Sequence, residues 1–409
     1  MAPRPPAPLP VARRRAPLVL VPLALVPLVL AGCSGEPSAS GPSAPASTPA
    51  PASTPAPGST PAPGSTPAPD SGGGGTAPTG SPAAGPQVLA EGLVAPWGIA
   101  FLPGGDALVS ERDSARVLRV PAAGGQPVEV GRVAQARPAG EGGLLGLALS
   151  PSYARDGLVY AYVTTAEDNR VVRFRLPAAG ADVDAEPVLT GIPKGTIHNG
   201  GRLAFGPDGS LYAGTGDTGD TTLAHDAASL GGKVLRMTPD GDPVDGASSL
   251  VFSDGHRNVQ GLAFDPQGRL WATEFGQSAY DEVNQVSEGD DGGWPEVEGA
   301  GDGGGRFAAP EVVWTTDEAS PSGVAYAAGS LWVAALRGER LWQVPLDGSG
   351  GAGEPTALLE GDHGRLRAAA TAPDGSLWLL TSNRDGRGDP APADDRVLRL
   401  TVDGSASKA

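Results

Sequence analysis

The chain contains 409 residues, with a formal net charge of −17 at pH 7 and a single cysteine. This acidic balance argues against nucleic acid as a partner, because binding to phosphates requires clustered basic residues. One cysteine excludes a disulfide within the chain, and the excess of acids is most simply explained as a means of keeping the protein soluble.

Residues 1–33 are predicted to be a bacterial lipoprotein signal peptide. Arg4 and three arginines ending at Arg15 precede an apolar run that ends in LAGC, so Cys33 would become the lipidated N-terminus. The alternative is a transmembrane helix over residues 16–32, but this run is short and contains three prolines. We therefore expect an extracellular protein whose contact with the membrane is its lipid anchor. Removal of four arginines and no acids would lower the net charge from −17 to −21.

Residues 34–86 consist almost entirely of Pro, Ala, Ser, Thr and Gly. Such a composition buries too little apolar surface to fold, so it predicts a disordered tether. The folded domain is predicted over residues 87–403, and residues 404–409 are predicted to be a disordered tail.

The folded part repeats one unit six times: a small apolar strand, a turn of Pro-Gly type, a second apolar strand, and a third strand rich in Val, Leu and Arg. The first two strands of the six units read GIAFLPGGDALVS, GLALSPSYARDGLVYAYV, LAFGPDGSLYAG, GLAFDPQGRLWAT, GVAYAAGSLWVAAL and AATAPDGSLWLLT. The third strands read RVLRV, RVVRFRL, KVLRM, DEVNQV, ERLWQV and DRVLRL. Shorter runs such as QPVEVGRV and EPVLTGI supply candidates for a fourth strand.

Four strands per unit and about fifty residues per repeat predict an all-β fold, a six-bladed β-propeller. Too few residues follow DRVLRL for a fourth strand in the last unit, while QVLAEGL at 87–93 precedes the first unit. This N-terminal strand should complete the last blade and close the ring. No long amphipathic helical pattern competes with this assignment, and the segment that best suits a helical turn is TTLAHDAASLGG.

Polar residues concentrate at two phases of the repeat, before the first strand and after the second. Because antiparallel strands alternate in direction, both phases fall on one face of a propeller, and the Pro-Gly turns fall on the other. These residues include the arginines Arg257, Arg337, Arg365 and Arg367. Guanidinium groups pair with carboxylates in a bidentate manner, so the cluster indicates a small polyanionic ligand. The alternative is that each arginine simply holds neighbouring blades together.

Among the four histidines, His198 is the best candidate for a general base. It lies one strand pair before Asp217, a carboxylate that would orient the imidazole and stabilise its charged form. The alternative is an ordinary polar residue at the mouth of a strand. His256 is assigned a structural role, and His225 and His363, which show no partner pattern, are assigned to the surface.

The segment EFGQSAYDEVNQVSEGDDGGWP places four acids among glycines, namely Asp281, Glu282, Asp290 and Asp291. Carboxylates and accessible carbonyls suit a hard cation such as Ca²⁺. Solvated acidic turns are the alternative interpretation.

The chain resembles the quinoprotein sugar dehydrogenases, both the soluble glucose dehydrogenase and, more closely, the aldose sugar dehydrogenases that use pyrroloquinoline quinone (PQQ). The resemblance covers essentially the whole propeller and rests on four motifs together: HNGGRLAFGPDG, GHRNVQGLAF, LWATEFG…DEVN…GGWP and RLRAAATAPDG.

The resemblance implies that His198 accepts the proton of the anomeric hydroxyl of an aldose while hydride passes to PQQ, giving a lactone. Arg257 and Asn258 would contact the quinone oxygens. Glu141, Arg337, Arg365 and Arg367 would contribute the other contacts to the cofactor. Carbonyls of Gly276 and Gln277 would hold an activating Ca²⁺, and Glu282 with Gly292 a second. The electrons would pass to an unidentified acceptor.

The sequence departs from the family at four of these positions. Glu141 replaces a glutamine, which puts an anion beside an anionic cofactor unless Glu141 is protonated or turned away. Arg337 replaces a lysine, Gln277 replaces a proline, and Ile197 replaces an acid next to the histidine, which argues against tight recognition of glucose. Two other functions are compatible with the fold: a binding module that has lost the cofactor, and a metal-dependent lactonase.

Overall fold

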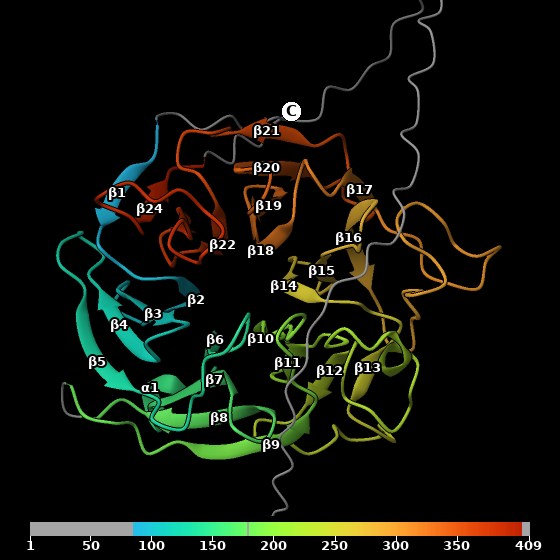
Figure 1. The fold of residues 1–409 in the computed structure, drawn as a ribbon, viewed down its shortest axis with the longest axis horizontal. Coiled ribbons are helices and arrows are strands. Elements are labelled where there is room, and N and C mark those ends of the chain that lie inside the picture. Colours follow the sequence, from blue (N-terminus) through green and yellow to red (C-terminus); the bar gives the residue numbers. More distant parts are fainter. Residues whose placement is uncertain (1–84, 178–179, 403–409) are drawn as a thin grey trace, which may run out of the picture. The chain divides into compact units, whose positions relative to one another are not determined.

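The computed structural model describes residues 85–177 and 180–402, and these residues form a ring of six four-stranded antiparallel sheets around a central axis (Figure 1). The predicted six-bladed β-propeller is confirmed. The predicted signal peptide, Cys33, almost all of the tether and the C-terminal tail lie outside the described residues.

The first three blades follow the chain order. Blade 1 contains β2 (Pro96–Phe101), β3 (Ala107–Glu111), β4 (Arg116–Val120) and β5 (Val128–Arg132). Blade 2 contains β6 (Leu144–Leu149), β7 (Leu158–Thr164), β8 (Asn169–Arg175) and β9 (Glu186–Ile192). Blade 3 contains β10 (Leu203–Phe205), β11 (Leu211–Gly214), β12 (Val234–Met237) and β13 (Val251–Ser253).

Blades 4 and 5 repeat this arrangement, and blade 6 closes the ring. Blade 4 contains β14 (Val259–Phe264), β15 (Leu270–Glu274), β16 (Tyr280–Val286) and β17 (Val312–Thr315). Blade 5 contains β18 (Pro321–Ala327), β19 (Ser330–Ala335), β20 (Arg340–Pro345) and β21 (Thr356–Leu358). Blade 6 joins β22 (Leu366–Thr371), β23 (Leu377–Thr381) and β24 (Val397–Leu400) to the N-terminal β1 (Gln87–Ala90). The predicted closure is confirmed by the antiparallel pairing of Gln87 with Arg399.

The innermost strands are rich in Gly and Ala because six of them converge on the axis. A Cβ atom on Gly146 of β6 would lie 2.2 Å from the carbonyl oxygen of Gly201 beside β10, and one on Gly323 of β18 would lie 2.7 Å from Cα of Ala368 in β22. Further out, the second strands carry fully buried tryptophans at one repeat position: Trp271, Trp332 and Trp378. Small residues inside and large residues between the blades match the wedge shape of each blade.

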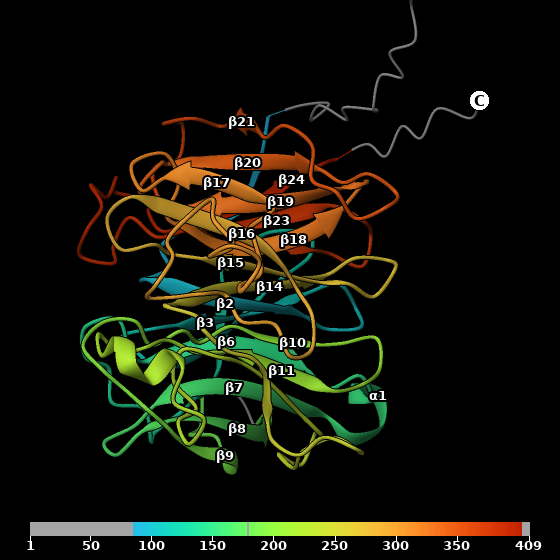
Figure 2. The same ribbon diagram turned by 90° about the vertical axis from the view of Figure 1, so that its right-hand side faces the viewer.

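Two short helical segments interrupt the sheets. The predicted helical turn is a 3₁₀ segment, Thr221–Ala224, whose N-cap Asp220 accepts a hydrogen bond from the amide of Thr222. The four-residue helix α1 (Tyr153–Asp156) lies in the turn between β6 and β7 and was not expected from the sequence. Figure 2 shows α1 on the face of the propeller that carries the turns between the first and second strands of the blades. Within the described ranges, no helix has the length and apolar character needed to cross a membrane.

Candidate active site

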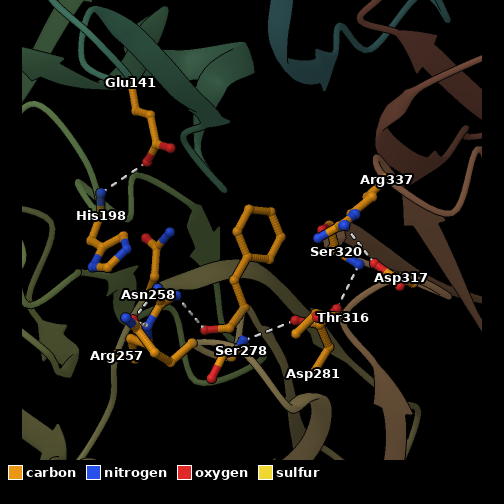
Figure 3. A pocket seen from close by; sticks show the side chains of 13 residues that line it. Glu141, His198, Arg257, Asn258, Ser278, Asp281, Thr316, Asp317, Ser320 and Arg337 are labelled. Carbon is orange, nitrogen blue, oxygen red and sulfur yellow. Dashed lines mark hydrogen bonds and ion pairs between the residues drawn. The ribbon is translucent and has the colours of Figure 1, made fainter. Parts of the chain in front are cut away.

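A cavity of about 450 Å³ opens on the face where the inner strands begin. Its lining comes from blades 2 to 5 and includes Glu141, His198, Arg257, Asn258, Gly276, Gln277 and Arg337. Figure 3 shows Glu141 and His198 on one side of this cavity and Arg337 with Asp317 on the other. The volume lies within the range of ligand-binding pockets, so residues separated by up to 196 positions in the sequence can contact a single ligand.

His198 is held in a strained conformation beside a carboxylate. Its φ is +51°, a value that few residues other than glycine adopt, and it is 8% exposed. Its Nδ1 lies 2.6 Å from Oδ1 of Asp217, and Trp294 Nε1 donates to Oδ2 of the same carboxylate at 2.9 Å. The predicted pairing of His198 with Asp217 is therefore present in the structure.

The pairing also determines which ring nitrogen is free. Burial alone would raise the pKa of Asp217, but the hydrogen bonds from His198, Gly219 and Trp294 outweigh burial and lower it. An ionised Asp217 can only accept, so Nδ1 of His198 carries the proton. The lone pair on Nε2 is then available to a proton donor in the cavity, which is the arrangement that a general base requires.

Glu141 meets neither of the two conditions, protonation or a turn away from the site, under which it would not place an anion beside the cofactor. Its Oε2 accepts a hydrogen bond from the backbone amide of His198 at 2.8 Å, and its Oε1 accepts one from Nη2 of Arg387 at 2.8 Å. Although burial would raise the pKa of Glu141, these two hydrogen bonds and the charge of Arg387 lower it. Glu141 thus lines the cavity as an anion whose charge is balanced by Arg387 of blade 6.

Arg257 and Asn258 lie side by side at the start of β14. The guanidinium of Arg257 donates to Oε1 of Gln277 at 2.7 and 2.9 Å and to the carbonyl of Phe275 at 2.9 Å. The side-chain carbonyl of Asn258 accepts from the amide of Gly200 at 3.0 Å, while its Nδ2 is buried and has no partner. An unpaired buried donor on a cavity wall indicates that a ligand oxygen completes its hydrogen bonding.

The other three arginines do not lie together at the cavity. Arg337 lines it and pairs with Asp317, but its side chain is 61% exposed. Arg365 and Arg367 share the buried carboxylate of Asp385, at 3.0 and 3.4 Å. Arg367 lines a much smaller adjoining cavity with Glu141 and Arg387, whereas Arg365 lines neither of these two cavities.

The two predicted carbonyl ligands of Ca²⁺, Gly276 and Gln277, also line the large cavity. Their loop is organised by Glu298, whose Oε1 accepts hydrogen bonds from four successive amides, of residues 277–280, at 2.7 to 3.2 Å. With its amides turned toward Glu298, this loop presents Gly276 and Gln277 to the cavity. Their carbonyl oxygens are suitable ligands for a hard cation.

The predicted second pair, Glu282 and Gly292, lines another small cavity together with Glu274 and Glu298. Burial, and then the charge of Glu274, raises the pKa of Glu282 to about 7. No cluster of three or more His, Cys, Asp or Glu side chains in the described part of the chain is arranged to hold a metal ion.

His225 and the acids of the Gly-rich segment have partners that the sequence did not indicate. His363, assigned to the surface, is instead half-buried, and its Nδ1 is buried without a hydrogen-bond partner. His225, expected to be a surface group without a partner, lies 2.8 Å from Oδ1 of Asp291 and stacks on Phe307. Asp290 accepts a hydrogen bond from the amide of Ser287. Asp281 is buried and accepts from the amides of Gly276 and Ser320, so it supports the cavity wall and is not a solvated turn residue.

Comparison with known proteins identifies the family. The family model described as glucose/sorbosone dehydrogenase matches residues 93–393, most of the described propeller. The chain belongs to this family. The predicted resemblance is confirmed.

Individual relatives agree with this assignment. The chain is 56% identical to the aldose sugar dehydrogenase of Streptomyces coelicolor, solved in its PQQ-bound form, with a TM-score of 0.75 over 79% of this chain and 100% of that one. It is 28% identical to the aldose sugar dehydrogenase YliI of Escherichia coli, over 73% of this chain and 90% of the relative. It is 30% identical to quinoprotein glucose dehydrogenase B of Acinetobacter calcoaceticus, over 54% of each. Together they support a PQQ-dependent sugar dehydrogenase.

The residues that line the large cavity fit a polyanionic quinone. The cavity has the size of a ligand pocket, the orphaned Nδ2 of Asn258 supplies a donor, and the guanidinium groups of Arg257 and Arg337 supply positive charge on its wall. Three residues that contribute to this arrangement escaped the sequence analysis: Asp385, Arg387 and Glu298. Asp385 and Arg387 lie in the loop between β23 and β24, and Glu298 lies in the long loop between β16 and β17.

Proposed function

We propose that the chain oxidises aldose sugars at C1 to lactones, with His198 as the general base. The observation that carries the proposal is the His198–Asp217 pair at the wall of a cavity whose donors suit an anionic quinone. Bound PQQ would supply the hydride acceptor and bound Ca²⁺ a Lewis acid that polarises it. Arg257, Asn258, Arg337 and Arg367 are the proposed contacts to PQQ, and Gly276 and Gln277 the proposed ligands of Ca²⁺. Arg365 lines neither cavity, so its proposed role is to share Asp385 with Arg367.

The chain's own part in the reaction is to take a proton. As C1 of the sugar loses hydride, its hydroxyl proton passes to Nε2 of His198 and the C1–O bond becomes a carbonyl. The imidazolium that forms is stabilised by the ionised Asp217 at 2.6 Å. The proton then leaves to solvent, and an electron acceptor of unknown identity reoxidises the cofactor.

The choice of sugar is governed by residues around His198. Ile197 is 38% exposed beside the base, where an acid would hydrogen-bond a sugar hydroxyl. An apolar side chain at this position discriminates poorly among aldoses, which supports a broad specificity and not a tight preference for glucose.

We also propose a cellular location for the protein. The signal sequence ending at Cys33 supports an extracellular protein attached to the bacterial membrane by a lipid. A Cys33→Ala variant should lose the attached lipid, as measured by incorporation of a labelled fatty acid. Labelling of that variant equal to that of the wild type would contradict the anchor.

The decisive experiment is an isothermal titration of the purified protein with PQQ in the presence of Ca²⁺, followed by dye reduction with a panel of aldoses. We expect heat from binding and then turnover that depends on both additions. The absence of heat on addition of PQQ would favour a recognition module that has lost the cofactor. Lactone hydrolysis without quinone would favour a metal-dependent lactonase.

A further inference from the structure

The central channel has a second cavity, at the end opposite the proposed active site. It measures about 250 Å³ and is lined by all six inner strands, with one residue of each being Ile99, Leu147, Leu203, Leu262, Val324 and Ala369. Figure 1 shows these strands, β2, β6, β10, β14, β18 and β22, around the axis. The far cavity is therefore a property of the whole ring and not of one loop.

Arg202 provides the one charged group in the lining of this far cavity. Its Nε donates to the carbonyl of Gln260 at 2.8 Å, and its guanidinium lies 4.3 Å from the ring centre of Trp97. Arg202 is 8% exposed, and its Nη2 is buried with no hydrogen-bond partner. The side chain is thus held firmly, while part of its donor capacity is unused.

The charge of Arg202 is also unbalanced. Among the described residues, no carboxylate forms an ion pair with it, whereas its neighbour Arg367 has Asp385. Burial first, and then the charge of Arg367, lower the pKa of Arg202 to about 9, so the guanidinium remains charged at neutral pH. A buried cation without a counter-ion is costly, and it is stabilised when an anion joins it.

Arg202 separates this space from the proposed active site. Trp97 and Gln260, which Arg202 contacts, line the small cavity that adjoins the active-site cavity. Arg202 itself lines only the far cavity among these spaces. An anion in the far cavity would therefore not compete directly for the quinone's contacts.

We propose that the far cavity is an anion-binding site in which Arg202 holds one small monoanion, a halide or a short-chain carboxylate. The single buried cation sets the charge of the ligand, since a second negative charge would find no partner. The aliphatic walls favour a weakly hydrated ion or a carboxylate with a short apolar tail over a strongly hydrated anion. The inference does not depend on the proposed dehydrogenase activity.

The test uses the full-length protein without quinone. Crystals grown with sodium bromide should show an anomalous peak beside the Arg202 guanidinium. In solution, the thermal midpoint should rise with bromide or acetate, with sodium sulfate keeping the ionic strength constant. A larger rise with acetate would identify a carboxylate site, and a rise with bromide alone a halide site. Both results support the proposal.

Variants separate this site from general salt effects. Arg202→Met should weaken anion binding at least tenfold, because it removes the charge but keeps an apolar chain against Trp97. Arg399→Gln, at a half-buried arginine that pairs with Asp374 on the same face, should respond like the wild type. If the methionine variant does not fold, two other measurements test the proposal. They are anion binding by Arg202→Lys, which keeps the charge, and the anomalous peak in crystals of the wild type.

Two results together would overturn the proposal: no anomalous peak in the far cavity, and midpoints of wild type and Arg202→Met that respond identically to both anions. Water would then be the group that solvates Arg202.

Discussion

Two histidine–acid pairs occupy the same phase of neighbouring blades and have different environments. His198 and Asp217 belong to blade 3, with 2.6 Å between Nδ1 and the carboxylate. His256 and Glu274 belong to blade 4, with 2.8 Å between the corresponding atoms. In both, the histidine precedes the inner strand and the acid follows, or ends, the second strand. The repeat therefore generates the pair itself.

The two pairs differ in the surroundings of the second ring nitrogen of the histidine, Nε2. Nε2 of His256 lies 2.8 Å from Oγ of Ser253, and His256 is 2% exposed. His198 lines the large cavity, and its Nε2 has no hydrogen-bond partner among the described residues. A histidine with both nitrogens engaged is a structural link, while one with a free nitrogen at a cavity can transfer a proton.

The largest expected effect is that of His198→Asn. Asparagine tolerates a positive φ, so the fold should persist, but the general base is lost. We expect kcat to fall by about 10²- to 10⁴-fold, measured by dye reduction, with PQQ affinity in calorimetry unchanged. Turnover at the wild-type rate would remove His198 from the mechanism.

A third pair of the same phase, in blade 6, uses arginines in place of histidine. Asp385→Asn leaves Arg365 and Arg367 buried without their counter-charge and should cost about 3–5 kcal/mol of unfolding free energy at pH 7. Denaturant titration measures this change. Asp374→Asn, which breaks the exposed pair with Arg399, is the control and should cost less than about 1 kcal/mol.

The effect of Asp385→Asn should depend on pH. Burial would raise the pKa of Asp385, but the charges of Arg367 and Arg365 lower it. A lowered pKa in the folded state stabilises at neutral pH, and the stabilisation is lost as the pH falls through that pKa. The difference between wild type and variant should therefore shrink below about pH 4. A difference independent of pH would show that packing, not charge, is responsible.

His256→Asn should have the opposite profile to His198→Asn. It removes two buried hydrogen bonds and should lower the unfolding free energy by about 1–3 kcal/mol. Turnover per folded, cofactor-loaded molecule should stay within a few-fold of the wild type. A loss of turnover as large as that of His198→Asn would erase the distinction between the two pairs.

The smallest effect is expected from Glu141→Gln. An amide oxygen can still accept from the backbone of His198, but the negative charge is removed and Arg387 is released. PQQ affinity should rise by up to about tenfold, as measured by calorimetry, because an anion beside an anionic ligand is gone. Arg387→Gln should have the opposite sign, and an equal effect of both variants would contradict the charge argument.

The propeller could be predicted because each unit has a recognisable local pattern: a strand of small residues, a turn and a strand of large residues recur six times. The His198–Asp217 pair could be predicted for the same reason, since both residues belong to one blade and differ by 19 positions. The Glu141–Arg387 contact could not, because 246 positions separate the two residues. Only ring closure brings blade 6 beside blade 1, and so brings Arg387 near the loop that carries Glu141 from blade 1 into blade 2.

The amino-acid sequence by itself determined the number of blades, the closing strand and the face on which polar side chains gather, because those features follow from local periodicity. The tertiary structure alone decided which histidine keeps a free nitrogen, how the charge of Glu141 is balanced, and that Arg202 is buried without a counter-ion. Hydrogen bonding and desolvation depend on neighbours that the ring assembles from distant blades, and no local pattern specifies them.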